Sequence, residues 1–250
     1  MKKIDFLITG GSGFLGSSIA NYLLKKNYKI LIFDNNSRGK LERLLKSKNL
    51  FFIKGDIKNF KDLNKCSKYK IGNIIHMAYI NGTKNFYKYP IDVMEVAYYG
   101  MINILNFSIK NNIKKFFLAS SSEVYGKPKR IPTDERETLK IEDVFNPRFS
   151  YAGGKIFCEL IASTYRKKFN KLIIFRPHNI FGADMGKDHV VPEIIEKIKN
   201  SKKNKISIIG TGNETRAFMY VEDFSRALYT IIKRGQHMNI YNIGIKKETK

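Results

Sequence analysis

The chain has 250 residues, 43% of them hydrophobic, and carries a formal net charge of +24. This size and composition fit a globular protein with one domain, or with one large and one small lobe, and exclude a disordered chain. No apolar run reaches the ~18–20 residues of a membrane span. The N-terminus shows no signal-peptide pattern, and Cys66 and Cys158 stand far apart with no paired ligand motif. We therefore expect a cytoplasmic protein without disulfides or a metal site.

The positive charge does not by itself indicate a nucleic-acid-binding protein. Lysines are spread over nearly every predicted helix and loop, and no arginine-rich stripe or aromatic-interleaved basic run stands out. Lys, Asn and Ile are all abundant, a bias typical of A/T-rich coding sequences. We interpret the charge as a solvated surface whose field favours small anionic substrates, and we expect neither nucleic acid nor membrane as a partner.

The first predicted element is a strand over residues 4–9 that stops at a glycine-rich turn. Residues 9–16 read Thr-Gly-Gly-Ser-Gly-Phe-Leu-Gly, and a helical pattern follows over 14–26. Three glycines permit a tight turn, close approach of the backbone to a pyrophosphate, and close packing of the helix on the strand. These are Gly10, Gly13 and Gly16. The alternative is a glycine turn that only packs the helix on the sheet.

The second apolar run supports the binding interpretation. It covers residues 30–34 and ends on Asp34, where a carboxylate can accept hydrogen bonds from both hydroxyls of an adenosine ribose. A strand, a glycine turn, a helix and then an acid at the end of the next strand are together typical of a dinucleotide site. Because Asp34 would repel a 2′-phosphate, we expect NAD rather than NADP.

Apolar runs continue to alternate with helix-length amphipathic segments through the first 180 residues. Further strands are predicted over 50–54, 73–78, 115–120 and 171–176, and further helices over about 89–111 and about 149–169. This alternation implies right-handed βαβ crossovers and a doubly wound parallel sheet of the Rossmann type, an α/β fold. We assign residues 1–177 to this NAD-binding domain.

The rhythm changes after the last of these strands. The pattern predicts a loop at Gly182–Asp188, a helix at Pro192–Lys199, a strand at Ile206–Ile209, a helix at Val221–Lys233 and a strand at Ile240–Ile243. We assign 178–250 to a small substrate-binding lobe, interleaved with the end of the sheet domain. Residues 121–148 contain three prolines and many charges, and should form a surface loop over the site.

One tyrosine–lysine pair is placed for proton transfer. Tyr151 and Lys155 are four residues apart near the start of the helix over 149–169, so phenol and ammonium share a face. A nearby ammonium favours phenolate, which lets the tyrosine exchange a proton with a substrate hydroxyl. Three other pairs have the same spacing, but only Tyr151 follows the fifth strand and its loop, where ligands bind. They are Tyr22/Lys26, Tyr125/Lys129 and Tyr229/Lys233.

The fifth strand, over 115–120, runs into the sequence Ser-Ser-Ser-Glu-Val-Tyr-Gly. A hydroxyl at the end of this strand can hydrogen-bond the same substrate oxygen that Tyr151 protonates or deprotonates. The alternative is a serine-rich turn that satisfies its own backbone.

Together these landmarks resemble the extended short-chain dehydrogenase/reductase family, the nucleotide-sugar epimerases and dehydratases, over essentially the whole chain. Further matching motifs are Gly55-Asp56-Ile57, His76-Met77-Ala78, Arg176-Pro177-His178-Asn179-Ile180-Phe181-Gly182, Arg216 to Asp223, and Tyr241-Asn242-Ile243-Gly244. The resemblance implies a bound NAD held by Gly10, Gly13, Phe14, Leu15, Gly16, Asp34, Asp56, Ile57, Ala78, Tyr151, Lys155 and His178.

The resemblance also implies the catalytic and substrate-binding residues. Ser121, third before Val124, corresponds to the family's catalytic hydroxyl, beside Tyr151 and Lys155. Asn179 and Arg216 would hold the diphosphate of a nucleoside-diphosphate sugar, and the stretch from Val190 onward would contact its base. A guanidinium such as that of Arg216 binds phosphate in a bidentate manner.

The chain departs from the family pattern at several positions. Tyr79 stands where an alanine is frequent, Ala97 replaces a usual asparagine, and Ala217 replaces a usual aspartate. The chain also ends soon after Gly244, whereas relatives continue for several elements, so either the sequence is a truncated copy or its substrate lobe is shortened.

The resemblance implies transient oxidation at C4 of the sugar. Tyr151 would remove the hydroxyl proton while hydride passes to NAD, and the 4-keto sugar would take hydride back on its other face. This predicts an NAD-dependent 4-epimerase.

A second interpretation rests on Glu123, because 4,6-dehydratases and sugar-acid decarboxylases carry a glutamate here that can abstract the C5 proton. A third interpretation is a non-catalytic NAD or nucleotide-sugar binding protein.

The predicted helices over 89–111 and 149–169 carry more apolar residues than one sheet face requires. Two such helices from each of two subunits can form a four-helix interface, so we expect a homodimer. The alternative is that both apolar faces are covered within one subunit.

Overall fold

Seven parallel strands form the central sheet of the computed structural model, which describes residues 1–186, 189–201, 205–208 and 210–249. The order across the sheet is β3-β2-β1-β4-β5-β6-β9. The strands are β1 (Lys2–Thr9), β2 (Ile30–Asp34), β3 (Leu50–Lys54), β4 (Tyr69–His76), β5 (Lys115–Ala119), β6 (Lys171–Pro177) and β9 (Ile240–Ile243). The strand order reverses between β1 and β4, which is where ligands bind in Rossmann-type sheets.

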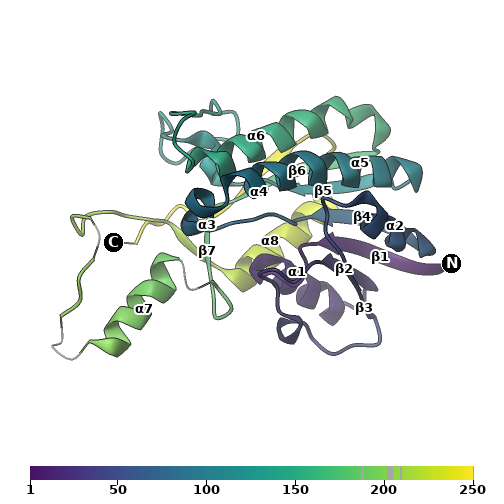
Figure 1. Ribbon diagram of the computed structural model, residues 1–250, viewed down its shortest axis with the longest axis horizontal. Helices are drawn as coiled ribbons and strands as arrows, with labels where there is room; N and C mark the ends of the chain where they lie inside the picture. Colours follow the sequence, from purple (N-terminus) through teal and green to yellow (C-terminus); the bar gives the residue numbers. More distant parts are fainter. Residues whose placement is uncertain (187–188, 202–204, 209, 250) are drawn as a thin grey trace.

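Helices cover both faces of the sheet, as the predicted doubly wound fold requires (Figure 1). One face is covered by α1 (Phe14–Lys25) and α8 (Val221–Arg234), and the other by α2 (Phe60–Asn64), α5 (Met101–Lys110) and α6 (Phe149–Thr164). Every residue of β2 is buried, because the strand lies between the two helix layers. The carboxyl ends of the strands are therefore the exposed edge of the sheet that is free to bind a ligand.

The predicted helix over 89–111 is not continuous. Pro90 begins α4 (Pro90–Glu95), a π-helical turn follows over Val96–Gly100, and α5 continues from Met101. A short α3 (Thr83–Lys88) precedes them. Likewise the predicted helix over 149–169 ends at Thr164 and is followed by a 3-10 turn over Arg166–Lys168. Other 3-10 turns are Leu41–Arg43, Lys65–Lys68 and Ser122–Tyr125.

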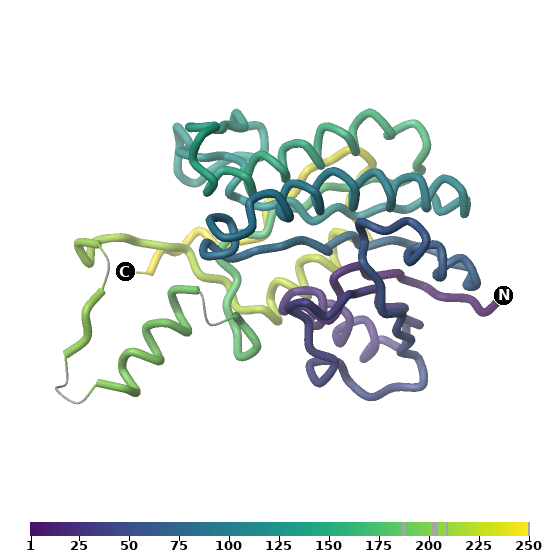
Figure 2. Tube along the Cα trace, in the orientation of Figure 1, coloured from purple at the N-terminus to yellow at the C-terminus, as the bar shows by residue number. Residues whose placement is uncertain are grey.

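After β6 the C-terminal part of the chain leaves the central sheet, and it returns to that sheet at β9 (Figure 2). A two-stranded parallel sheet of β7 (Asn179–Phe181) and β8 (Phe218–Tyr220), absent from the sequence prediction, lies beside it. Between them α7 (Val190–Asn200) has no buried residue. The strand expected at Ile206–Ile209 is wrong for 206–208, which are irregular, and Ile209 lies outside the described residues. The predicted loop at Gly182–Asp188 is irregular as far as 186, and its last two residues also lie outside them.

A buried guanidinium joins the pieces that surround the strand ends. Arg176, in β6, is only 2% exposed and donates two hydrogen bonds to the Glu159 carboxylate of α6, at 2.8 and 2.6 Å. It also donates to the Tyr125 hydroxyl at 2.7 Å and to the backbone carbonyl of Glu135 at 3.0 Å. The guanidinium thus joins β6 to α6 on one side and to Tyr125 and Glu135 on the other.

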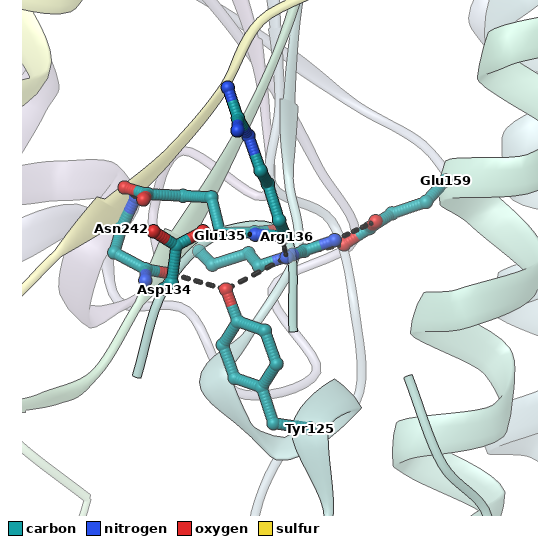
Figure 3. A network of polar contacts seen from close by, with 7 residues as sticks. Tyr125, Asp134, Glu135, Arg136, Glu159 and Asn242 are labelled. Carbon is teal, nitrogen blue, oxygen red and sulfur yellow. Dashed lines mark hydrogen bonds and ion pairs between the residues drawn. The ribbon is translucent and has the colours of Figure 1, made fainter. Parts of the chain in front are cut away.

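The same network reaches the last strand of the sheet (Figure 3). Tyr125 donates to the side-chain oxygen of Asn242 at 2.8 Å, and the Asn242 backbone amide donates to the Glu135 carboxylate at 2.8 Å. The Asn242 amide group donates to the Thr133 carbonyl at 3.0 Å. Residues 121–148, largely irregular as predicted, are therefore attached to β6, β9 and α6 rather than free on the surface.

Removal of the carboxylate should destabilise the fold strongly. Glu159→Ala leaves the Arg176 charge buried without its counter-ion, and we expect the free energy of unfolding to fall by about 3–5 kcal/mol. Urea denaturation followed by circular dichroism measures it. The control is Glu193→Ala, which breaks the partly exposed pair with Lys197 at 3.0 Å and should cost about 0.5 kcal/mol or less. Equal losses in the two variants would contradict this account.

Candidate active site

A cavity of about 400 Å³ opens at the carboxyl ends of the strands and collects almost every site residue predicted from the sequence. Its lining includes Gly10, Gly13, Phe14, Leu15, Gly16, Asp34, Asp56, Ile57, Ala78, Ser121, Glu123, Tyr151, Lys155, His178, Asn179 and Val190. These residues come from seven or more separate segments of the chain. The sheet topology brings them together because parallel strands end at one edge.

The glycine turn between β1 and α1 has the geometry that a phosphate-binding loop needs. Gly10 has a φ of +71°, and a Cβ there would lie 2.6 Å from the backbone nitrogen of Ala78. A Cβ on Gly16 would collide with the Gly10 carbonyl oxygen. The helix α1 begins at Phe14, after Gly13, so its unpaired amides face the cavity. Two of the three glycines are therefore required by space alone.

Asp34 is held in a fixed orientation at the end of β2. Its carboxylate accepts from the backbone amides of Ser12 at 3.0 Å and Asn36 at 2.8 Å, and its side chain lines the cavity. Because the amides come from the glycine turn and from the segment after β2, the acid lies where a ribose beside the pyrophosphate would be. This geometry fits the predicted ribose contact.

Asp56 and Ile57 form the wall beyond Asp34. The Asp56 carboxylate accepts from the Lys58 backbone amide at 2.8 Å, which fixes the turn after β3. Ile57 is buried and packs on Gly100, where a Cβ would lie 3.1 Å from its side chain. An apolar side chain beside a carboxylate is a suitable surface for the adenine and its ribose.

Tyr151 and Lys155 lie side by side at the inner end of the cavity, on α6. The Ser121 side chain, just after β5, also lines the cavity, and it partly offsets the effect of burial on the pKa of the Tyr151 phenol. The Lys155 ammonium donates to the backbone carbonyl of Ala119 at 2.8 Å, also at the end of β5. Both side chains are buried, and burial disfavours charge. It raises the pKa of the Tyr151 phenol well above its ordinary value and lowers the pKa of Lys155 to about 8.

Glu123 lies on the open side of the same cavity. Its backbone amide donates to the Ser121 hydroxyl oxygen at 3.2 Å, and its carboxylate pairs with Arg148 at 3.3 Å. Both members of the ion pair are about half exposed, at 50% and 41% of their side-chain surface. Arg148 also lines the cavity and was not anticipated from the sequence.

One predicted site residue, Arg216, lies elsewhere, as do the three tyrosines set aside in favour of Tyr151. Arg216 is exposed, pairs through its backbone with Thr249, and directs one guanidinium nitrogen to the Thr215 carbonyl at 2.7 Å. It is not among the residues that line the cavity. The tyrosines with the same spacing to lysine as Tyr151 have other surroundings, since Tyr22 and Tyr229 pack on each other at 5.5 Å between α1 and α8. Tyr125 belongs to the network of Figure 3.

Sequence reasoning missed the aromatic surroundings of Tyr151. The Phe86 ring stacks on the Tyr151 ring at 4.8 Å between centroids and 22° between planes, and Tyr79 meets it edge-on at 5.2 Å. Both come from the segment between β4 and α4. The only sequence signal was the departure from the family pattern at Tyr79.

The comparison with known sequences gives the family. The profile of the NAD dependent epimerase/dehydratase family matches residues 6–244. The chain belongs to this family. It is 34% identical over 251 residues to a dTDP-D-glucose 4,6-dehydratase of Dictyostelium discoideum, which covers 95% of the chain and 57% of the relative. It is 33% identical to a UDP-N-acetyl-alpha-D-glucosaminuronate decarboxylase of Bacillus cytotoxicus, covering 99% of the chain and 77% of the relative.

Solved structures agree on the fold. A UDP-glucose 4-epimerase of Thermotoga maritima, solved with UDP-glucose, superimposes with a TM-score of 0.87 at 26% identity, covering 98% of this chain and 78% of that one. The chain spans little more than half the length of the Dictyostelium relative. The similar proteins thus include a dehydratase, a decarboxylase and an epimerase, all named for nucleotide sugars.

NAD is the cofactor of this family, and the cavity fits it. The turn at Gly10 leaves no room for a side chain, the α1 amides face the cavity, and Asp34 is held ready to accept from a ribose. Within the described residues no helix is long and apolar enough to cross a membrane, and no cluster of three or more metal-ligating side chains is found.

The carboxylate of Asp34 should set the choice between the two nicotinamide cofactors. NAD⁺ should bind at least about tenfold more tightly than NADP⁺, a difference of about 1.4 kcal/mol, because a 2′-phosphate would lie against a buried carboxylate. Asp34→Asn should bring the affinities for NAD⁺ and NADP⁺ closer together, because it removes the charge that repels the 2′-phosphate. Isothermal titration calorimetry measures both ligands, with Asp223→Asn on the exposed side of α8 as the control. Equal affinities in the unaltered protein would refute the assignment.

Proposed function

We propose that the protein is an NAD-dependent nucleotide-sugar 4-epimerase. The observation that carries this proposal is the contact of Tyr151 with Ser121 and the position of Lys155 at the inner end of a dinucleotide-binding cavity. A buried phenol, a hydroxyl and an ammonium around one point can move a proton to and from a sugar hydroxyl. Tyr151, Ser121, Lys155 and Glu123 are the proposed catalytic residues.

In the proposed reaction NAD supplies the hydride acceptor and donor at C4. Tyr151 takes the proton of the C4 hydroxyl while Ser121 hydrogen-bonds the same oxygen. Lys155 lowers the cost of the phenolate, which burial alone makes unfavourable. After the keto sugar turns within the cavity, the same tyrosine returns the proton to the C4 oxygen. The residues thus orient the sugar, move one proton and exclude water.

The ion pair of Glu123 favours epimerisation over chemistry at C5. A carboxylate that abstracts the C5 proton must be a free base, whereas this one is paired with the Arg148 guanidinium at 3.3 Å. The 4,6-dehydratase and sugar-acid decarboxylase reactions through Glu123 are therefore the second candidates. A non-catalytic protein that binds NAD or a nucleotide sugar is the third.

The substrate should lie across the outer part of the cavity. Asn179 and Val190 line it and are proposed for the diphosphate and the base of a nucleoside-diphosphate sugar. Arg216 is also proposed for the diphosphate, although its guanidinium bonds a neighbouring carbonyl in this structure.

We propose residues 1–177 as the NAD-binding domain and 178–250 as the substrate lobe. The buried, unpaired Cys66 and Cys158 suit a reducing cytoplasm, which is the proposed location.

A panel of nucleoside-diphosphate sugars tests the reaction and separates its alternatives. Incubation in D₂O followed by mass spectrometry should show an isomer of unchanged formula and no deuterium at C5. Tyr151→Phe should abolish turnover while NAD⁺ binding persists, and Glu123→Gln should slow it only modestly because C5 is untouched. Loss of water or CO₂ would assign a dehydratase or a decarboxylase. NAD⁺ and sugar binding without turnover would assign the non-catalytic alternative.

We also propose that two copies of the chain pair through the outer surface of α4, the π-turn, α5 and α6. This surface exposes large apolar side chains, including Ile91, Met94, Tyr98, Tyr99 and Leu160. Tyr98 connects the two helices, with its ring 5.1 Å from that of Tyr99 and 5.7 Å from that of Phe157 on α6. A continuous apolar face on two neighbouring helices supports a two-fold four-helix interface.

Light scattering coupled to size exclusion at micromolar concentration measures the assembly. The protein should elute as a dimer of the 29.0 kDa chain, and Tyr98→Glu should convert it to a monomer by placing a charge at the centre of the proposed interface. Phe145→Glu is the matched control, because Phe145 is highly exposed but lies on the loop over 121–148. A monomer that persists on concentrating the unaltered protein overturns the proposal.

A further inference from the structure

The surroundings of Lys155 contain a side chain to which the proposed reaction gives no role. Tyr79 follows β4 and lines the cavity, and its ring lies beneath the Lys155 ammonium, with Nζ 4.0 Å from the ring centroid. The same ring meets the Tyr151 ring edge-on, at 88° between planes. One side chain therefore touches both members of the proton-transfer pair.

The Tyr79 hydroxyl does not explain this placement. The oxygen is fully buried and has no hydrogen-bond partner among the described residues. Burial raises the pKa of this phenol well above its ordinary value, so it stays neutral. A buried hydroxyl without a partner is unfavourable compared with a plain ring. The part of Tyr79 that contacts Lys155 is therefore the face of its ring and not its hydroxyl.

Helix α6 makes room for Tyr79 at one residue. A Cβ on Gly154 would collide with the Tyr79 hydroxyl oxygen and would lie 2.9 Å from the Ala97 side chain. The preceding Gly153 is different, since a Cβ there would meet only Ile141, at an ordinary 3.7 Å. Glycine inside a helix is unfavourable compared with alanine. The space for Tyr79 explains Gly154, whereas nothing in the structure requires Gly153 to be glycine.

The face of an aromatic ring attracts a cation most strongly where the cation has lost its water. Lys155 meets this condition, because it is only 4% exposed and has a single hydrogen bond described, to Ala119. The titratable groups around it are Tyr151, Cys158 and Glu159 on its own helix, His76 at the end of β4, and Tyr79 itself. His76 is kept neutral by burial. No counter-ion contacts the ammonium among these described groups.

We propose that Tyr79 is a positioning residue of the active site, whose ring holds the Lys155 ammonium and the Tyr151 ring in place, and that Gly154 is its matched partner. A role for Tyr79 in catalysis rests on the proposed function. The packing of Tyr79 against Gly154 and the effect of its ring on Lys155 do not depend on that function. Tyr79 and Gly154 should therefore be coupled in stability, and the ring should affect cofactor binding through Lys155.

The pairing is tested by thermal unfolding of single and double variants. Gly154→Ala should lower the melting temperature by several degrees, whereas Gly153→Ala should leave it unchanged or raise it. Tyr79→Phe removes the colliding oxygen, so Tyr79→Phe/Gly154→Ala should recover at least half of the loss caused by Gly154→Ala alone. Additive effects in the double variant, or equal effects of the two glycine substitutions, would overturn the pairing.

The effect on Lys155 is tested by the pH dependence of NAD⁺ binding, measured by calorimetry without any sugar. Lys155 is among the residues that the family resemblance places on NAD, and we propose that its ammonium holds the nicotinamide ribose. The affinity for NAD⁺ should therefore fall as pH rises through the pKa of Lys155. Loss of the ring makes the ammonium less favourable and lowers that pKa. In Tyr79→Leu the midpoint of the fall should therefore move to lower pH by about one unit, whereas Tyr79→Phe should keep it.

A variant of the same shape guards against misfolding of the leucine variant. Pentafluorophenylalanine at position 79 keeps the ring but reverses its quadrupole, so it should shift the midpoint in the same direction as Tyr79→Leu. An unchanged midpoint in this folded variant overturns the role of the ring. The result is independent of the sugar panel, so a protein without turnover can still confirm or refute it.

Discussion

The burial of one guanidinium constrains everything around the strand ends. Arg176 is 2% exposed and cannot lose its charge, so the fold must supply partners for each of its nitrogens. It obtains them from Glu159 on α6 and from two parts of residues 121–148, Tyr125 in the 3-10 turn and the carbonyl of Glu135. These hydrogen bonds form only when α6, Tyr125 and Glu135 are placed around Arg176 as they are here. The parts of residues 121–148 that contact Arg176 are therefore held in place, even though this segment has little regular structure.

The same constraint orients α6. Glu159 lies one turn beyond Lys155 and two turns beyond Tyr151, so the three side chains share one face of α6. Because the Glu159 carboxylate is bonded to β6 by two hydrogen bonds, this face is held against the sheet. The other end of the face is then positioned next to the end of β5, where Ser121 and the Ala119 carbonyl meet Tyr151 and Lys155.

The cavity combines two environments suited to two tasks. At its outer end the backbone supplies polar groups, with the amides of α1 and the carboxylate of Asp34 matching a pyrophosphate and a ribose. At its inner end the buried Tyr151 and Lys155 lie among aromatic rings, with Phe86 stacked on Tyr151 and Tyr79 under Lys155. Burial there disfavours the charged form of both side chains, raising the pKa of Tyr151 and lowering that of Lys155.

The sequence determined the parallel sheet, the glycine turn, Asp34 and the tyrosine–lysine pair, because each depends on a local period or spacing that the chain carries in full. It did not determine the break in the helix over 89–111, the ion pair of Glu123 or the exposed position of Arg216. Nor did it predict the partners of Arg176 or the packing of Tyr79 against Gly154. These depend on which distant segments meet, and only the tertiary structure decides where a buried charge or a bulky ring finds room.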